Sequence, residues 1–148
     1  MAGKSNTYET ELLQLIFNNT AMALVGDASG IQPSATAGSL YFSLHTADPG
    51  EAGTQTTSET AYTGYVRKGL ARTSGNFNVA AGALNLVANL DFDACTASPG
   101  AALTHFAIGT AVSGTGKILY SGTLTPNITM AVGVIPRITT AANLVTED

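Results

Sequence analysis

The sequence is poor in charge. Asp, Glu, Lys and Arg make up 11% of its 148 residues, with a formal net charge of −4 and only six basic residues, whereas about a quarter of a typical soluble domain is charged. Nucleic-acid recognition needs clustered Lys and Arg, so no nucleic-acid partner is expected. The one basic cluster, Arg67, Lys68 and Arg72, is expected to lie on a solvated strand edge that discourages aggregation.

Cysteine and long apolar runs are also scarce. The single cysteine, Cys95, excludes an intrachain disulfide framework, and we expect it to be a small, partly buried residue. The residues that follow Met1 are polar and do not form an apolar signal region. No stretch approaches the roughly 18 apolar residues that a membrane-spanning helix needs. We therefore expect synthesis in the cytoplasm and no membrane partner.

Small residues are abundant instead, since Ala, Gly, Ser and Thr supply nearly half of the chain. The apolar fraction of 45% is ordinary, which argues against disorder, and the length suits one domain with its own core. Small, neutral, Thr-rich sequence is typical of close-packed strands and of surfaces that meet other proteins.

Two periodicities divide the chain. Apolar residues at 3- and 4-residue spacing predict a helix over about 6–18, capped by Asn6, with a possible further turn to 25 and then a loop to 38. From residue 39 the period changes to two. The predicted strands are 40–45, 64–72, 76–80, 84–92, 103–109, 117–125, 128–134 and 137–145.

These elements predict a mainly β fold. We expect an antiparallel sandwich or distorted barrel of about 7–8 short strands with an N-terminal helix. The expected domains are a helix and loop arm over 1–38 and a β-domain over 39–148. Residues 50–61 show no period and are predicted to form a long exposed loop.

No pattern indicates catalysis, a metal or a cofactor. His45 and His105 lie on predicted strands without the partners of a catalytic triad. Asp91 and Asp93 lie in an apolar strand, which is poor geometry for a shared metal ion or for glycoside hydrolysis. Residues 109–117 are rich in glycine but lack P-loop spacing, so we expect a hairpin connection there.

Several long motifs resemble a family of tailed-bacteriophage virion structural proteins, whose members are labelled head decoration (cement) or tail-fibre proteins. The motifs are SLHTADPGEAGTQTTSE at 43–59, YTGY at 62–65, DFDACTAS at 91–98, THFAIGTA at 104–111, SGTGKILYSGTLTPNI at 113–128 and TED at 146–148. The sequence departs from this family at 66–70, where Lys68 and Gly69 are expected to mark a strand edge or bulge.

The resemblance implies a virion structural protein that is made in the host cytoplasm and has no enzymatic activity. The leading expectation is a capsid decoration or cement protein, a minor capsid protein that binds the major capsid protein on the capsid exterior and stabilises capsomer contacts. It would associate with itself as a homotrimer, with a dimer as the other possibility.

The alternative is a tail-fibre tip, adaptor or baseplate component involved in host attachment. The chain has no repeat from which a fibre shaft could be built, but its 50–61 loop could touch a host glycan through Tyr62 and Tyr65. For either location in the virion, the candidate interface residues are large apolar or aromatic side chains, each of which could equally belong to the core. They are Leu12, Leu15, Ile16, Phe17, Tyr41, Tyr62 and Tyr65.

Overall fold

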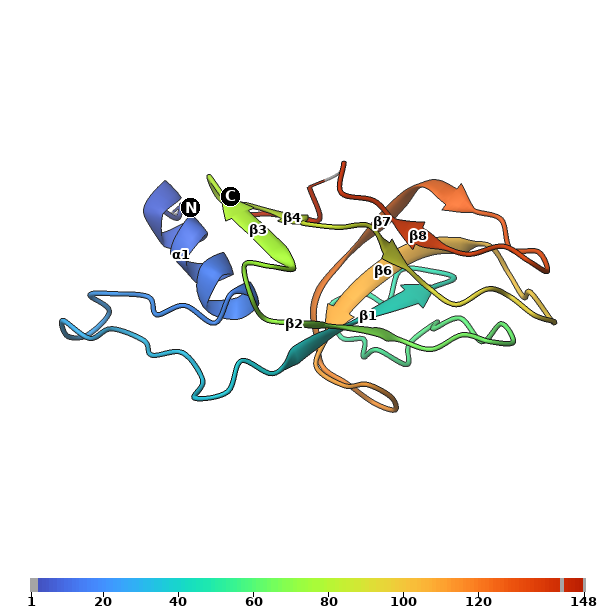
Figure 1. Cartoon of the computed structure of the whole chain (residues 1–148), viewed down its shortest axis with the longest axis horizontal. Coiled ribbons are helices and arrows are strands. Elements are labelled where there is room, and N and C mark those ends of the chain that lie inside the picture. The colour runs from blue at the N-terminus through green and yellow to red at the C-terminus, as the bar shows by residue number, and fades with distance from the viewer. Residues whose placement is uncertain (1–2, 142, 148) are drawn as a thin grey trace. The chain divides into compact units, whose positions relative to one another are not determined.

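The computed structural model describes residues 3–141 and 143–147. Its fold is mainly β, with one N-terminal helix and several antiparallel sheets (Figure 1), which confirms the predicted fold class. The elements are α1 (Asn6–Phe17), β1 (Ser39–His45), β2 (Lys68–Ala71), β3 (Phe77–Ala80), β4 (Ala83–Leu86), β5 (Leu90–Asp91), β6 (Leu103–Gly109), β7 (Ile118–Ile128), β8 (Arg137–Ile138) and β9 (Val145–Thr146). The pairings among the described strands close no barrel.

The chain forms two compact units. Unit 1 comprises Met1–Ser39, Ala71–Asn89 and Thr139–Asp148, and unit 2 comprises Leu40–Leu70 and Leu90–Ile138. The chain therefore passes from one unit to the other four times. Within the described residues, no helix has the length and apolarity needed to cross a membrane.

Helix α1 follows the predicted bounds closely but has a different cap. The Ser5 hydroxyl accepts a hydrogen bond from the Tyr8 N–H at 3.3 Å, so Ser5 and not Asn6 is the N-cap. Asn19 has φ +51°, a left-handed conformation that lies outside the helix. The possible further turn to residue 25 therefore does not form.

Unit 1 is built by packing α1 against the β3–β4 hairpin. Leu13 and Phe17 are fully buried and lie four residues apart, so they share one face of the helix. The Phe17 ring meets Phe77 of β3 edge-on, with ring centroids 5.2 Å apart. Strand β9 pairs with β4 and completes a three-stranded sheet.

Unit 2 is built around a four-stranded sheet of order β2-β1-β6-β7. Strand β1 pairs antiparallel with β6 from Tyr41↔Gly109 to His45↔His105. In each of these two central strands five of the seven residues are buried, and the buried residues include consecutive ones, so side chains on both faces of the sheet are covered. Strand β2 lies at the edge and begins at Lys68, which confirms the edge predicted from its sequence.

Several later strands are shorter than predicted, whereas β7 runs on to Ile128, past its predicted end at 125. The 84–92 strand is split into β4 and β5, and the 128–134 segment is not a strand. The 128–134 segment makes isolated backbone hydrogen bonds and no strand ladder. The Cys95 N–H donates to the Val134 carbonyl at 2.9 Å, and the Gly133 N–H donates to the Cys95 carbonyl at 2.8 Å. Cys95 is 1% exposed, in agreement with its predicted role as a small buried residue.

Candidate functional site

The segment that joins β1 to β2, residues 46–67 (the long loop), is held against the sheet by a buried glutamine. Gln55 has no exposed surface. Its Nε2 donates to the Tyr41 carbonyl at 3.1 Å, and its Oε1 accepts from the Ala111 N–H at 2.9 Å. The prediction of an exposed loop over 50–61 is therefore wrong at its centre, because this amide replaces missing backbone pairing.

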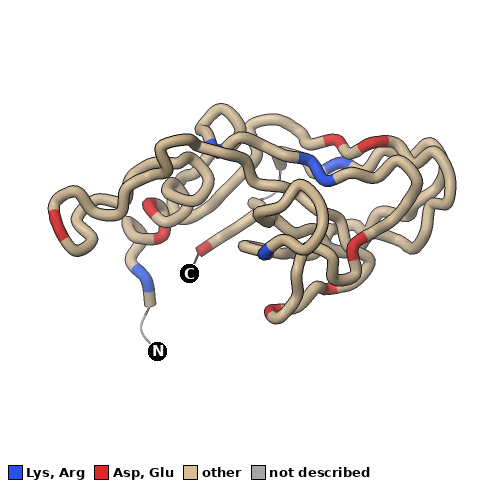
Figure 2. Tube along the Cα trace, turned by 90° about the horizontal axis from the view of Figure 1, so that it is seen from below, with Lys and Arg blue, Asp and Glu red and all other residues tan. Residues whose placement is uncertain are grey.

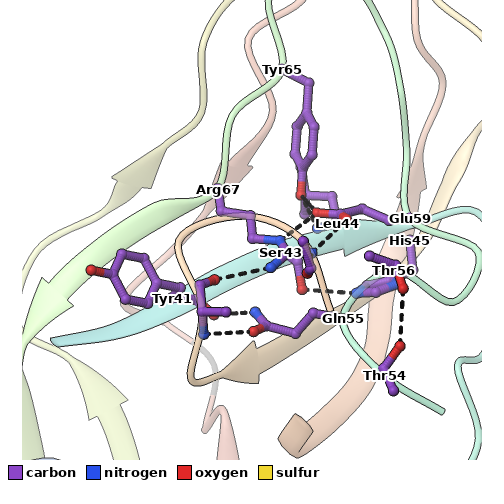
Figure 3. Close-up of polar contacts among 12 residues, drawn as sticks. Tyr41, Ser43, Leu44, His45, Thr54, Gln55, Thr56, Glu59, Tyr65 and Arg67 are labelled. Atoms are coloured by element: carbon purple, nitrogen blue, oxygen red, sulfur yellow. Dashed lines mark hydrogen bonds and ion pairs between the residues drawn. The ribbon is translucent and has the colours of Figure 1, made fainter. Parts of the chain in front are cut away.

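A buried ion pair lies near the end of the long loop (Figure 3). The Arg67 guanidinium donates to both Glu59 carboxylate oxygens at 2.7 Å, and to the carbonyls of Ala111 at 3.0 Å and Gly114 at 2.8 Å. The side chains of Arg67 and Glu59 are 3% and 16% exposed, and the hydrogen bond to Glu59 raises the pKa of Arg67. Arg67 thus ties the long loop to residues 110–117 (the β6–β7 turn).

Tyr65 completes this cluster. Its hydroxyl donates to Glu59 Oε1 at 2.8 Å and accepts from the Leu44 N–H at 3.1 Å. Its ring stacks on Phe92 at an interplanar angle of 14°. Burial raises the pKa of the Tyr65 phenol. The Tyr65 hydroxyl therefore supports the long loop from within, and its hydrogen bonds are made inside the fold.

A serine–histidine pair is also buried in this region. The carbonyl of Thr57 can only accept, so His45 Nδ1 donates to it at 2.8 Å and His45 Nε2 accepts from the Ser43 hydroxyl at 2.9 Å. Ser43 and His45 have no exposed surface, so no substrate reaches this pair. Asp48 starts the next turn as predicted, because its Oδ1 accepts from the Gly50 N–H at 2.9 Å.

The residues of the predicted basic cluster are used inside the fold. Arg67 is in the buried ion pair, and Arg72 donates to the carbonyls of Leu15 and Ile16 at 2.6 and 2.5 Å, which satisfies the last turn of the helix. The expectation of a solvated edge is wrong for both arginines. It holds better for Lys68, whose side chain is 26% exposed beside Asp93.

Charged residues are sparse along the whole trace (Figure 2). No group of three or more His, Cys, Asp or Glu in the described part of the chain is arranged to hold a metal ion. The charges that contact one another in unit 2 do so in pairs of opposite sign, as at Asp91 and Arg137.

The predicted interface residues fall into two groups. Phe17 is fully buried and Tyr62 is 2% exposed, so both belong to the core of their own units. The Tyr62 hydroxyl donates to the Asp93 carbonyl at 2.9 Å, and burial raises its pKa to about 12. The other predicted residues keep part of their surface exposed, and an interface role for them stays a prediction. They are Leu12, Leu15, Ile16, Tyr41 and Tyr65.

A groove of about 350 Å³ opens above the buried ion pair. Its walls are residues 59–62 and 65–67 of the long loop and residues 112–114 of the β6–β7 turn. Val66 is 53% exposed and Val112 is 62% exposed, so the rim is apolar. The walls of this groove are held from beneath by the Glu59–Arg67 ion pair and by the hydrogen bonds of Arg67 to Ala111 and Gly114.

Sequence reasoning missed Gln55, Glu59 and Arg67 as the residues that build this groove. One sequence feature does relate to them, because glycines flank the glutamine in space. A Cβ added at Gly109 or Gly116 would lie 2.2 or 2.1 Å from atoms of Gln55. These glycines were interpreted as turn residues, and their distance from residue 55 along the chain hides the contact.

Taken together, the fold and the site define a β-rich protein with a fixed groove on unit 2. Residues 3–146 match the family described as Podophage GP4 fiber I protein gp80, and the chain belongs to that family. It is therefore a structural protein of a tailed-phage virion. The comparison with curated proteins gave no match. The family description names a fibre protein, so it favours the tail alternative over the capsid exterior.

Proposed function

We propose that the chain is a non-enzymatic component of the phage tail fibre, at its tip, an adaptor or the baseplate, and that it takes part in host attachment. The observation that carries this proposal is the family match over residues 3–146, which names a fibre protein. A decoration role, with binding to the major capsid protein on the capsid exterior, is the competing proposal.

The geometry of unit 2 supports an attachment role. Gln55 and Arg67 fix the long loop and the β6–β7 turn from below, so the outer surfaces of both are preorganised, which lowers the entropy lost on binding. A second hollow, of about 390 Å³, lies between Asp48, Gly50 and Glu51 and residues 118–121 of β7. Asp48 and Glu51 bring carboxylates to the lining of this hollow and Tyr120 brings an aromatic side chain, a combination that suits a host-surface molecule with hydrogen-bond donors and an apolar face.

The hydroxyls of Tyr62 and Tyr65 are not the groups through which a glycan would be held. The hydroxyls of both are bound within the fold, to Asp93 and to Glu59. An attachment role therefore falls to the exposed parts of the long loop and of the β6–β7 turn.

The test is to locate the chain in the virion. Phage particles are disrupted mildly, heads and tails are separated, and the chain is quantified in each fraction by mass spectrometry. The tail-fibre proposal expects a small copy number that follows the tails. Hundreds of copies that follow the heads would overturn it in favour of decoration.

An adsorption assay tests the attachment part separately. The purified chain is added to host cells before phage, and the rate of phage adsorption is measured. A fibre tip is expected to slow adsorption in proportion to its concentration. A chain that is located in tails but leaves adsorption unchanged would be a structural part of the fibre without host contact.

A further inference from the structure

The last residue of β1, His45, lies buried beneath the long loop. Its ring has no exposed surface, and its Nδ1 donates to the carbonyl of Thr57, in the middle of that loop, at 2.8 Å. Glu59 of the same loop forms an isolated β-bridge with His45. At the other ring nitrogen, Nε2 accepts from the Ser43 hydroxyl at 2.9 Å (Figure 3). The long loop therefore covers the imidazole.

A proton on His45 would place a positive charge among groups that are already paired. Glu59 and Arg67 face the ring from the long loop, and His105 faces it from β6, where it is the cross-strand partner. Glu59 is already bound by Arg67 at 2.7 Å and by the Tyr65 hydroxyl at 2.8 Å. Burial lowers the pKa of His45. A backbone hydrogen bond and Glu59 oppose this lowering without reversing it, while Arg67 and His105 add to it. The covered ring is therefore neutral at about pH 7.

The long loop is the neighbour of His45 that opens at the lowest free-energy cost. An imidazolium needs water or a free anion, so acid favours states in which the ring is uncovered. On the sheet side, β1 is paired with β6 over five consecutive positions. The long loop is held by side chains and by isolated backbone bonds, such as that from the Thr60 N–H to the Leu44 carbonyl at 2.9 Å. Segments held in this way open before a continuous ladder does.

We propose that protonation of His45 opens the long loop while the sheet beneath it stays folded, so that the groove of unit 2 keeps its fixed form only while His45 is neutral. The groove is affected because residues 59–62 and 65–67 of the long loop form its walls. A contact made through the groove is therefore weakened in acid. This device goes beyond the proposed fibre role, because it holds whether the chain is located in tails or in heads.

The size of the effect follows from linkage. With the loop open, His45 regains its ordinary pKa of 6.5, whereas with the loop closed its pKa is lower. The closed loop is therefore favoured fully above about pH 6.5, and this advantage is lost as the pH falls toward the pKa of the closed state. The equilibrium constant for opening rises by at most about 25-fold between about pH 7 and about pH 5.

Hydrogen exchange of single amides, followed by NMR in the full chain, tests the proposal. Rates at about pH 7 and about pH 5 are corrected for the intrinsic pH dependence of exchange. The N–H groups of Gln55 and Thr60 report on the long loop, and that of Cys95, bound to the Val134 carbonyl at 2.9 Å, reports on the rest of unit 2. The protection of Gln55 and Thr60 is expected to fall about 5- to 25-fold at the lower pH, and that of Cys95 to stay unchanged.

Two histidine variants assign the response. His45→Gln cannot take up a proton in this range, so its long loop should be equally protected at both pH values. His105→Gln is the matched control, because it retains His45 and should respond as the wild type does. Circular dichroism checks that each variant is folded. The NMR titration of the His45 ring in the wild type needs no variant, and its midpoint should coincide with that of loop opening.

The proposal is overturned by a wild-type loop whose protection does not change with pH. An equal loss of protection at Cys95 would also overturn it, because unit 2 would then open as a whole. So would a pH response that persists in His45→Gln or disappears in His105→Gln, or a His45 titration whose midpoint differs from that of loop opening.

Discussion

At the scale of single residues, the most consequential side chain is one that carries no charge. Gln55 makes hydrogen bonds to two chain segments that are far from it in sequence, Tyr41 and Ala111. It fits only because glycines occupy the positions beside it. A long loop with little regular structure is thereby given a fixed conformation.

We predict that Gly116→Ala destabilises the protein. The new Cβ would lie 2.1 Å from Gln55 Oε1 and 2.7 Å from the Ala111 Cβ, so Gln55 must move and its buried hydrogen bonds are weakened. The expected loss is about 1–3 kcal/mol in the free energy of unfolding, measured by urea denaturation. Gly75→Ala is the control, because its nearest neighbour would be 3.6 Å away. Equal stability of the two variants would show that the site has room.

His45 should make stability depend on pH. Burial lowers its pKa below the ordinary value of 6.5, so the folded state favours the neutral ring more than the unfolded state does. The stabilisation is therefore complete above about pH 6.5 and is lost as the pH falls toward the pKa of the folded state. Urea denaturation at about pH 7 and about pH 5 measures this change. The His105→Gln variant retains His45 and should therefore show the same loss of stability at about pH 5. A wild-type protein whose stability did not change between the two pH values would contradict the assignment to His45.

At the scale of elements, the buried ion pair joins two loops that belong to different parts of the sequence. Glu59 lies in the long loop, and Arg67 reaches from the end of that loop to carbonyls of the β6–β7 turn. This guanidinium, together with Gln55, holds the walls of the groove to each other. The strength of the connection depends on its exclusion from water.

We predict that Arg67→Met costs about 3–5 kcal/mol in the free energy of unfolding, because it leaves the largely buried Glu59 carboxylate without its cationic partner. The double variant Arg67→Met, Glu59→Leu should recover part of this loss, since it buries no charge. Arg137→Met is the matched control. It breaks an exposed ion pair with Asp91 and should cost far less. Similar losses for Arg67→Met and Arg137→Met would mean that water reaches Arg67.

The β3–β4 hairpin offers a stabilising change. Its two turn residues, Ala81 and Gly82, have φ values of +50° and +70°, which is the geometry of a type I′ turn, for which Asn-Gly is the preferred sequence. Ala81→Asn is expected to stabilise the protein by about 0.5–1 kcal/mol, measured as a rise in Tm. Ala80→Asn, one position earlier, should not. A lower Tm for Ala81→Asn would contradict this.

The elements that the sequence predicts well are those whose pattern is local. Helix α1 and strands β1 and β6 fall close to their predicted bounds, because each carries a regular apolar period. The candidate site was hidden because its residues act through non-local contacts. The pairing of Glu59 with Arg67 and the burial of Gln55 depend on how loops are brought together, which no periodicity records. The segments after β7 were predicted as longer strands than they form, because their backbones make isolated hydrogen bonds where a continuous ladder was expected.

At the scale of the whole chain, neither compact unit is a continuous piece of sequence. Unit 1 joins the N-terminal helix to the β3–β4 hairpin and to the segment around β9. The expectation of an arm over 1–38 and a β-domain over 39–148 can be tested by cutting at that boundary.

We predict that deletion of residues 1–38 disrupts the fold of unit 1. Phe77 and Leu84, which have no exposed surface in the intact chain, would lose the helix that packs on their hairpin. The truncated chain should show a lower Tm and weaker dispersion of its unit 1 signals in NMR spectra. A truncated chain with the Tm of the intact protein would mean that 1–38 is a separable arm.

The arrangement of the groove has a consequence for how such a virus evolves. The groups that shape it, Gln55, Glu59 and Arg67, lie beneath the surface, whereas neighbouring positions such as Ala61 and Ser113 are exposed and bear little of the fold's stability. Mutation at the exposed positions alters what the groove contacts and leaves its framework intact. Under the proposed attachment role, a lineage would therefore change its binding partner by a few surface substitutions, in the way that antibody loops diversify on a constant scaffold.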